Sequence, residues 1–232
     1  MNFRLILLIS QIYIHILFFY GLYNFSATFT IPVIVVSHII FSGICGTVFF
    51  HRVVAHKNSI KPIYENLLLA ISTIGLSGSA LAWVATHRMH HRYSDTIRDP
   101  HCPKYNGLLK TYFYSSADSS SIRYVVDLLK DKRYTLQHKY YFHINIVYHT
   151  LLFVMLPFHL YWMACIVPGF VMWFTGSIIN CFSHNSSGPT NNDILGFLFA
   201  GEGWHKNHHL HASNPQFNIK YDWGYKFYTL LK

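Results

Sequence analysis

The stretch His87-Arg88-Met89-His90-His91 carries three histidines within five residues, and His205-Lys206-Asn207-His208-His209 repeats this spacing near the end of the chain. On a helix, residues three and four positions apart lie on one face, so the three imidazoles of each pentad would project together. Imidazole is a strong neutral ligand for iron, zinc, copper and nickel. The two pentads therefore predict two helices that bring metal-binding histidines to a shared site.

Chance does not account for the repeated pentad. Histidine makes up 17 of 232 residues, and at that frequency one His-x-x-His-His pentad is expected roughly 0.09 times per chain. The use of His as a neutral polar filler explains most other histidines of this chain but not a duplicated motif. With two histidines in His51-Arg52-Val53-Val54-Ala55-His56 and the isolated His184, we identify nine candidate ligands: His51, His56, His87, His90, His91, His184, His205, His208 and His209.

The spacing of the candidate ligands favours two metals over one. Residues five apart on an α-helix, such as His51 and His56, diverge by about 140°, so one helix could supply ligands to two neighbouring metals. Nine ligands also exceed the four that zinc takes. Asp95 and Asp99, just after the first pentad, are candidate hydrogen-bond acceptors that would fix imidazole tautomers. An ordinary solvated turn explains these two residues equally well.

Composition predicts an integral membrane protein, because 52% of the residues are hydrophobic and only 12% are charged. A membrane-spanning helix needs about 20 apolar residues. We expect one all-α domain over residues 1–232, with four transmembrane helices and a cytoplasmic helical cap that carries the His-rich site. The predicted spans are residues 5–23, 29–50, 144–163 and 166–183.

Two further segments are predicted to be helical without crossing the membrane. Residues 66–86 are apolar, but their glycines and serines and the cations on both sides favour an interfacial or re-entrant helix. Residues 120–143 are polar and are predicted to include an amphipathic helix that carries Val125, Val126, Leu128 and Leu129.

Charge distribution predicts the orientation in the membrane. All charged residues lie within the first four residues, within 51–143, or after 183, whereas the connections near 24–28 and 164–168 have none. The positive-inside rule then places both termini and the site on the cytoplasmic side, of a bacterial inner membrane or of the endoplasmic reticulum. The net charge of +9 would attract anionic headgroups or a phosphate-bearing carrier. Nucleic-acid binding is excluded, because no such module is visible.

Four cysteines show no paired spacing, and we interpret them as reduced packing residues: Cys45, Cys102, Cys165 and Cys181. Two other functional classes are alternatives for a chain with this many histidines. A haem could lie between His15 and His38 on adjacent predicted spans, as in a membrane electron-transfer protein. A metal transporter would place its ligands inside the bilayer. The haem class does not explain the pentads, and the transporter class does not fit because the clustered histidines lie outside the predicted spans.

The chain resembles the integral-membrane fatty acyl desaturases, of the stearoyl-CoA or acyl-lipid delta-9 type. The resemblance rests on the three histidine boxes in their order, on Trp83, on the run ending Asp99-Pro100-His101, on Asp127 to Asp131 with Tyr140-Tyr141, on Asn180 four residues before His184, and on Gly201-Glu202-Gly203-Trp204 before the last box. It implies a di-iron centre with O₂ as co-substrate, and an Asn180 side chain that reaches one metal through water. It further implies that one metal takes His51, His87, His91 and His208, and the other His56, His90, His184, His205 and His209.

Departures from the family pattern favour its bacterial-like branch. Ala85-Thr86 stands where animal enzymes carry an Arg-Asp pair that helps to hold coenzyme A, and residues 104–109 replace a basic-aromatic run. The substrate is expected to be a fatty acyl thioester or an acyl lipid. Because the chain ends soon after the third box, electrons are expected from a separate ferredoxin or cytochrome b5 type protein.

The reaction that the resemblance implies is the formation of a cis double bond, at the delta-9 position, in a saturated acyl chain. Neither carbon is chemically activated, so the protein's share is to position a tunnel at the metals. Trp83 is the candidate tunnel wall, with interfacial anchoring as its alternative. A membrane di-iron hydroxylase would use the same metals, and the histidines do not separate the two reactions.

Overall fold

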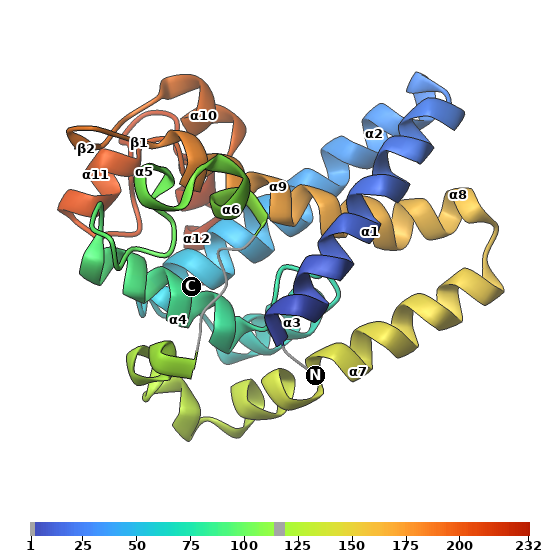
Figure 1. Cartoon of the computed structure of the whole chain (residues 1–232), viewed down its shortest axis with the longest axis horizontal. Coiled ribbons are helices and arrows are strands. Elements are labelled where there is room, and N and C mark those ends of the chain that lie inside the picture. Colours follow the sequence, from blue (N-terminus) through green and yellow to red (C-terminus); the bar gives the residue numbers. More distant parts are fainter. Residues whose placement is uncertain (1–2, 114–118) are drawn as a thin grey trace.

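The computed structural model describes residues 3–113 and 119–232, and these are mostly helical (Figure 1). The first half contains α1 (Phe3–Asn24), α2 (Ala27–Ser37), the π-helix η1 (His38–Ala55), α3 (Pro62–Thr73), α4 (Ala80–Tyr93), α5 (Pro103–Asn106), α6 (Leu108–Phe113) and the 3₁₀ turns η2 (Ser119–Val125) and η3 (Leu128–Lys130). The second half contains α7 (Lys132–Met155), α8 (Phe158–Tyr161), η4 (Trp162–Ile166), α9 (Val167–Phe182), strands β1 (His184–Asn185) and β2 (Gly188–Pro189), α10 (Asp193–Leu198), α11 (His205–Leu210) and α12 (Trp223–Leu231).

Three helices within the described residues are long and apolar enough to cross a membrane: Arg4–Asn24, Ala27–Ala55 and Phe158–Phe182. The second joins α2 to η1, and the third joins α8, η4 and α9 without a break. The third is the most enclosed, because 72% of its apolar window is buried inside the protein. Figure 1 shows these helices projecting to one side, while α4, α10, α11 and the two strands gather at the other.

The predicted span over 144–163 is wrong, and so is the outer connection near 164–168. Helix α7 ends at Met155, and the chain turns at Leu156 and Pro157 before α8 begins. The physical reason is local, since a residue before proline is pushed out of the helical conformation, and Leu156 has φ −113° and ψ 145°. The connection near 164–168 instead lies within the continuous helix Phe158–Phe182.

The two non-spanning segments also differ from their predictions. Residues 66–86 form parts of α3 and α4, which are joined by a turn where Leu76 and Gly78 have positive φ. Residues 120–143 form two short 3₁₀ turns and the first half of α7, whose first turn is capped by the Asp131 carboxylate accepting from the Arg133 N–H. The predicted amphipathic helix is therefore wrong. Of its apolar residues, Val125 is buried whereas Val126 is 52% exposed.

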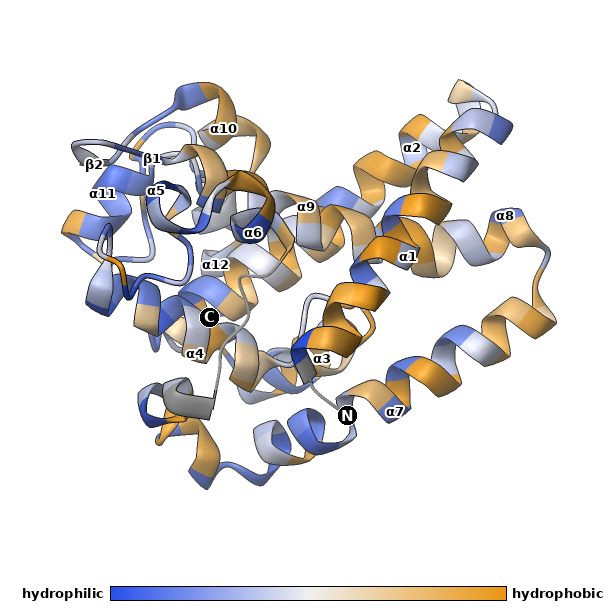
Figure 2. Ribbon diagram, in the orientation of Figure 1, coloured by the Kyte–Doolittle hydropathy of each residue, from blue (hydrophilic) through white to orange (hydrophobic). Residues whose placement is uncertain are grey.

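Helix α7 has two different halves (Figure 2). Its beginning is polar and packs against α3 and α4. Its end, next to α8, is apolar, and its side chains are exposed on the molecule: Ile146, Val147, Leu151, Phe153, Val154 and Met155.

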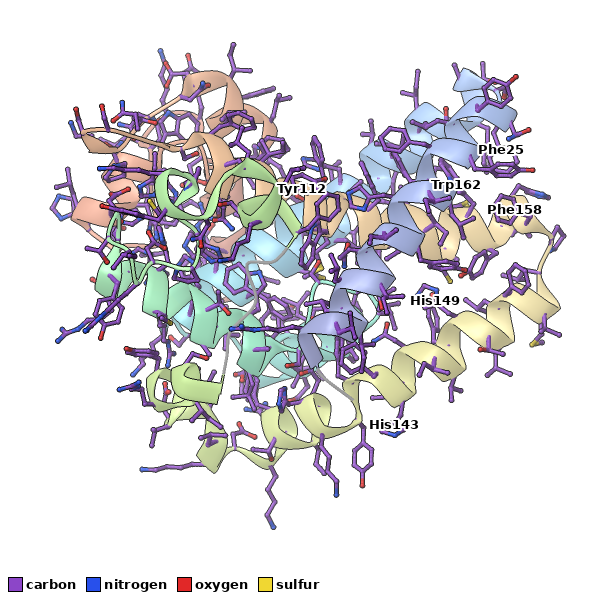
Figure 3. The ribbon with its side chains drawn as sticks, viewed as in Figure 1. Phe25, Tyr112, His143, His149, Phe158 and Trp162 are labelled. Carbon is purple, nitrogen blue, oxygen red and sulfur yellow. The ribbon has the colours of Figure 1, made fainter. Side chains whose placement is uncertain are left out.

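Aromatic packing holds α1 against the third long helix. The Phe18 and Phe170 rings stack with centroids 3.6 Å apart. Trp162, which lies with Phe25 and Phe158 at this crossing in Figure 3, donates from Nε1 to the Leu17 carbonyl over 3.1 Å. A Cβ at Gly21 would come within 2.0 Å of the Trp162 ring, so only glycine allows this close approach.

All four cysteines, which lie within the described chain, are free and buried, as predicted.

The fully buried Arg52 fastens the C-terminal segment to η1. Its guanidinium lies 2.9 Å from the Asp222 carboxylate and donates to the carbonyls of Pro215 and Ala200. It also lies 3.7 Å from Glu202. Gly201, with φ +99°, makes room for this group, because a Cβ there would lie 2.6 Å from both Arg52 and Asp222.

We expect Arg52→Met to lower the free energy of unfolding by about 3–5 kcal/mol, because it leaves buried carboxylates without their cation. Lys57→Met is the matched control: Lys57 pairs with Asp127 at the surface, where an ion pair contributes about 0–1 kcal/mol. Thermal denaturation of both variants in one detergent measures the difference. Equal melting temperatures would contradict a structural role for the buried group.

Candidate metal centre

All nine predicted ligands converge on one region from four separate elements. Helix η1 supplies His51, its C-cap residue is His56, β1 supplies His184, and the two pentads lie on α4 and α11. Helix α4 begins with the Ser79 side chain accepting from the Ala82 N–H and continues without a break through its pentad. The sequence prediction that these histidines gather is confirmed.

The imidazoles form two groups, and within each group the ligand atoms lie within 4.8 Å of one another. Among the described residues, the first group consists of His51, His56, His87, His91 and His208, and the second consists of His90, His184, His205 and His209. Each pentad therefore divides between the groups. The residues four apart, such as His87 and His91, stay together, while the residue between them turns to the other side of the helix face, because each residue advances about 100° around the axis.

His56 is the one ligand whose group was predicted wrongly. It faces His87, with the two Nε2 atoms 2.9 Å apart, and therefore belongs with His51. The cause is that η1 is a π-helix, in which the hydrogen bond runs from residue i+5 to residue i, and the His56 N–H donates to the His51 carbonyl over 3.1 Å. Residues five apart are then one turn apart and share a face, whereas α-helical geometry would have separated them.

The donor atoms of both groups fit a metal ion. The His208 Nε2 lies 2.9 Å from the Nε2 atoms of both His51 and His91. Likewise, the His209 Nε2 lies 3.1 Å from those of His90 and His205. One ring proton cannot satisfy three nitrogens that face one another, whereas a cation accepts a lone pair from each. Both groups therefore have the donor set of a metal site.

Carboxylates orient three of the imidazoles from outside. The Nδ1 atom of His90 donates to Asp99 and that of His184 to Asp95, both over 2.9 Å. This leaves Nε2 free to bind a metal, which is the usual arrangement around metal-ligating histidines. Accordingly, the His184 Nε2 is buried with no hydrogen-bond partner among the described residues. The placement predicted for both aspartates is thus observed.

A third carboxylate belongs to Glu202, for which the sequence predicted no role beyond its place in Gly201-Glu202-Gly203-Trp204. It accepts from the His51 Nδ1 over 2.7 Å. Burial raises the pKa of Glu202 to about 8, while the Arg52 guanidinium opposes this shift. Metal cations bound by the two histidine groups would, like Arg52, lower the pKa of Glu202 and so favour its carboxylate form. The available sequence signal was an acidic residue, rare in this chain, three positions before a histidine box.

Burial also keeps four of the ligand imidazoles neutral. It lowers the pKa of His56 to about 3, and it holds the pKa values of His87, His205 and His208 well below the ordinary range, with neighbouring imidazoles adding to the effect for these three. A neutral imidazole keeps the lone pair that a metal needs. The site is therefore ready to bind a metal at neutral pH without first releasing protons.

A cavity reaches both histidine groups from among η1, α4 and α9, and its wall includes His51, His87 and His205. Trp83 also lines it and stacks on His87, with ring centroids 5.1 Å apart and an interplanar angle of 16°. Asn180 lines it from α9, and its Nδ2 lies 3.3 Å from the His101 Nδ1. Both residues singled out from the sequence thus lie in the wall of one cavity at the metal centre.

The haem alternative finds no support in the positions of its two histidines. His15 bonds to the Gln11 carbonyl and to the Tyr112 hydroxyl, whereas His38 bonds to the Leu198 carbonyl in α10. Tyr112 is labelled in Figure 3 at the end of α6. Each ring is thus held by its own partners, and the two do not face a common space.

Comparison with known proteins agrees with the geometry. The chain is 32% identical over 199 residues to an acyl-CoA 5-desaturase of Anemone leveillei, covering 77% of this chain and 62% of that protein. It is 28% identical over 237 residues to an sn-1 stearoyl-lipid 9-desaturase of Anabaena variabilis, covering 90% and 85%. A protein of the same description from Synechocystis is 29% identical over 198 residues, covering 79% and 62%. The chain spans less than two-thirds of the length of the first of these relatives. Residues 25–223 match the family model for fatty acid desaturases, and the chain belongs to this family.

Proposed function

We propose that this protein is an O₂-dependent fatty acyl desaturase that introduces a cis double bond, at the delta-9 position, into a saturated acyl chain. The observation that carries the proposal is that two groups of imidazoles open onto one cavity. Relatives described as stearoyl-lipid 9-desaturases support the position of the double bond. In the overall reaction, two adjacent CH₂ groups lose one hydrogen each, and O₂ takes these with two electrons and two protons to give two waters.

Two iron ions, when bound, would supply the redox centre at which O₂ is reduced. His51, His56, His87, His91 and His208 would hold one ion, and His90, His184, His205 and His209 the other. Asn180 would reach one ion through a water. The carboxylates of Asp95, Asp99 and Glu202 would keep the proton of their imidazole on Nδ1 and so fix the ring orientation.

The cavity would bring the reacting carbons to the metals and exclude water from them. Because Trp83 lies flat against His87, an acyl chain that passes Trp83 would be held beside a metal ligand. Positioning of this kind carries much of the acceleration when the substrate itself is unreactive. Trp83 is therefore our proposed tunnel wall.

We propose four membrane crossings, with the termini and the metal centre on the cytoplasmic side. The three apolar helices supply three of them, and α7, which is 24 residues long and apolar in its second half, supplies the fourth before the chain turns at Leu156 and Pro157. The charges of α7, Lys132, Arg133 and Lys139, all lie in its first half. This arrangement fits a bacterial inner membrane or the endoplasmic reticulum.

The substrate would be a fatty acyl thioester or an acyl lipid, since relatives described as acyl-CoA and as acyl-lipid desaturases are both similar to this chain. The electrons would come from a separate one-electron carrier of ferredoxin or cytochrome b5 type. Membrane lipid would surround the protein, and we expect no nucleic-acid partner.

We expect the purified protein to bind close to two iron ions per chain, and His208→Ala to lose both metal and activity, because His208 contacts two other ligands of its group. His211→Ala, which changes an exposed histidine outside both groups, is the control. Metal analysis and activity assays measure the result. Full activity with one metal per chain, or a Soret band, would refute the di-iron assignment.

Expression in a host that cannot make monounsaturated fatty acids should restore growth and yield cis-monoenoic acyl chains. The His208→Ala protein, expressed in parallel, should restore nothing. Mass spectrometry of the total lipids identifies the product. If hydroxy acids dominate, the protein is a hydroxylase on the same scaffold, and the proposed desaturation is wrong.

The proposed topology predicts which introduced cysteines react with a membrane-impermeant reagent from each side. Lys130→Cys and Ser186→Cys should react from the cytoplasmic side, and Ala27→Cys from the other, since all three positions are exposed. The native cysteines are buried and should remain silent. Reaction of Lys130→Cys and Ser186→Cys from opposite sides would exclude a common side for the segments that build the metal centre.

A further inference from the structure

His101 is a buried histidine that belongs to neither imidazole group yet lines the same cavity. Its backbone N–H donates to Asp99 Oδ1 over 2.8 Å, and the same oxygen accepts from the His90 Nδ1 over 2.9 Å. The His101 ring packs against that of His90, with centroids 5.3 Å apart. Asp99 therefore fixes His101 and a metal ligand relative to each other.

The contact between His101 and Asn180 has a defined polarity. The Asn180 Nδ2 lies 3.3 Å from the His101 Nδ1. An amide nitrogen carries hydrogens and can only donate, so this Nδ1 accepts and the ring proton lies on Nε2. The NH₂ end of the Asn180 amide is thereby held toward His101, and its carbonyl Oδ1 is the end left for the cavity.

The orientation of this amide decides what Asn180 can bind. A water whose oxygen is bound to a cation has only its hydrogens to offer, so it needs an acceptor on its other side. The observed orientation presents such an acceptor, whereas the flipped amide would present two further donors. A buried donor that faces a donor loses its hydrogen bond and costs about 1–3 kcal/mol.

We infer that His101 is a positioning residue that holds the Asn180 carbonyl toward the metal centre. The inference rests on the proposed function, in which Asn180 reaches a metal through water. It assigns to His101 an action through Asn180 and no direct contact with metal or substrate. In the sequence, His101 is distinguished only as the end of the run Asp99-Pro100-His101 that supports the family resemblance.

The test uses the full chain and Co²⁺ alone as the probe, with the binding affinity and visible absorption of the bound ions as readouts. His101→Phe keeps a ring but removes the acceptor, and should weaken one Co²⁺ ion about tenfold and shift its absorption. Asn180→Leu should do the same. The double variant should be no weaker than either single variant, because both changes remove one interaction.

Two further variants separate orientation from simple packing. His101→Gln restores an acceptor oxygen and should bind Co²⁺ within about threefold of the unchanged protein, a smaller loss than the tenfold typical of removing such a partner. Asn180→Asp has an acceptor at either end of its side chain, so adding His101→Phe to it should cost no affinity. His143→Phe, which changes an exposed histidine on α7 (labelled in Figure 3), is the control and should bind normally.

Three outcomes would overturn the inference: unchanged Co²⁺ binding in His101→Phe, multiplied losses in the double variant, or a His101→Gln protein as weak as His101→Phe. If His101→Phe fails to fold, His101→Leu, which also removes the acceptor, takes its place in every comparison. Failure of the proposed function is a separate result, because it would appear as fewer than two ions in the unchanged protein or as a different reaction product.

Discussion

Nine imidazoles whose lone pairs must converge from four separate elements form the constraint on which this structure depends. Buried polar nitrogens without partners are costly, at about 1–3 kcal/mol each. Three of the rings have their outer nitrogen satisfied by a carboxylate, His51 by Glu202, His90 by Asp99 and His184 by Asp95. These bonds leave the inner nitrogens of these rings available, so the cost of burying them is recovered only when a metal binds.

The elements that carry the ligands are held together by a second buried polar group. Arg52 is the direct neighbour of His51 in η1, and its guanidinium bonds to Asp222 and to the backbone of Ala200. Ala200 precedes the loop that contains Glu202 and leads into α11. One cation therefore ties the first histidine box, the third box and the C-terminal segment into a single unit. The Phe217 ring lies 4.0 Å beneath the guanidinium and also packs on His208, which extends this unit to the ligands themselves.

The cavity lies where the metal centre meets the apolar helices. Its wall combines metal ligands with residues from the deeply buried helix α9, including Met172 and Gly176. In the proposed reaction an apolar substrate and an oxygen-activating centre would meet at such a boundary, because the ligands need a polar setting and an acyl chain needs an apolar one. The pair formed by His101 and Asn180 lies in this wall, which gives the cavity a polar group of fixed orientation close to the metals.

The sequence was sufficient to identify the histidines that form the two groups of candidate ligands. Spacings of three and four residues are local properties of an α-helix, so the projection of each pentad's imidazoles from one face of its helix follows from sequence alone. The first two predicted spans lie within observed apolar helices for the same reason. Pro157 also indicates the end of a helix, but the predicted span was extended across it because the residues on both sides are apolar. The division of each pentad between two groups was implied by the family resemblance and is seen in the structure.

Tertiary structure decided what depends on contacts between distant segments. The π-helical hydrogen bonding of η1 moved His56 into the group of His51, and nothing in the local spacing distinguishes a π-helix from an α-helix. The pairing of Glu202 with His51 and that of His101 with Asn180 join residues 151 and 79 positions apart. Sequence therefore determined which side chains could bind a metal, because that is a matter of chemistry and helical repeat. Packing decided which of them share an ion and which groups orient them, because burial leaves each polar atom only the partners that the fold brings within reach.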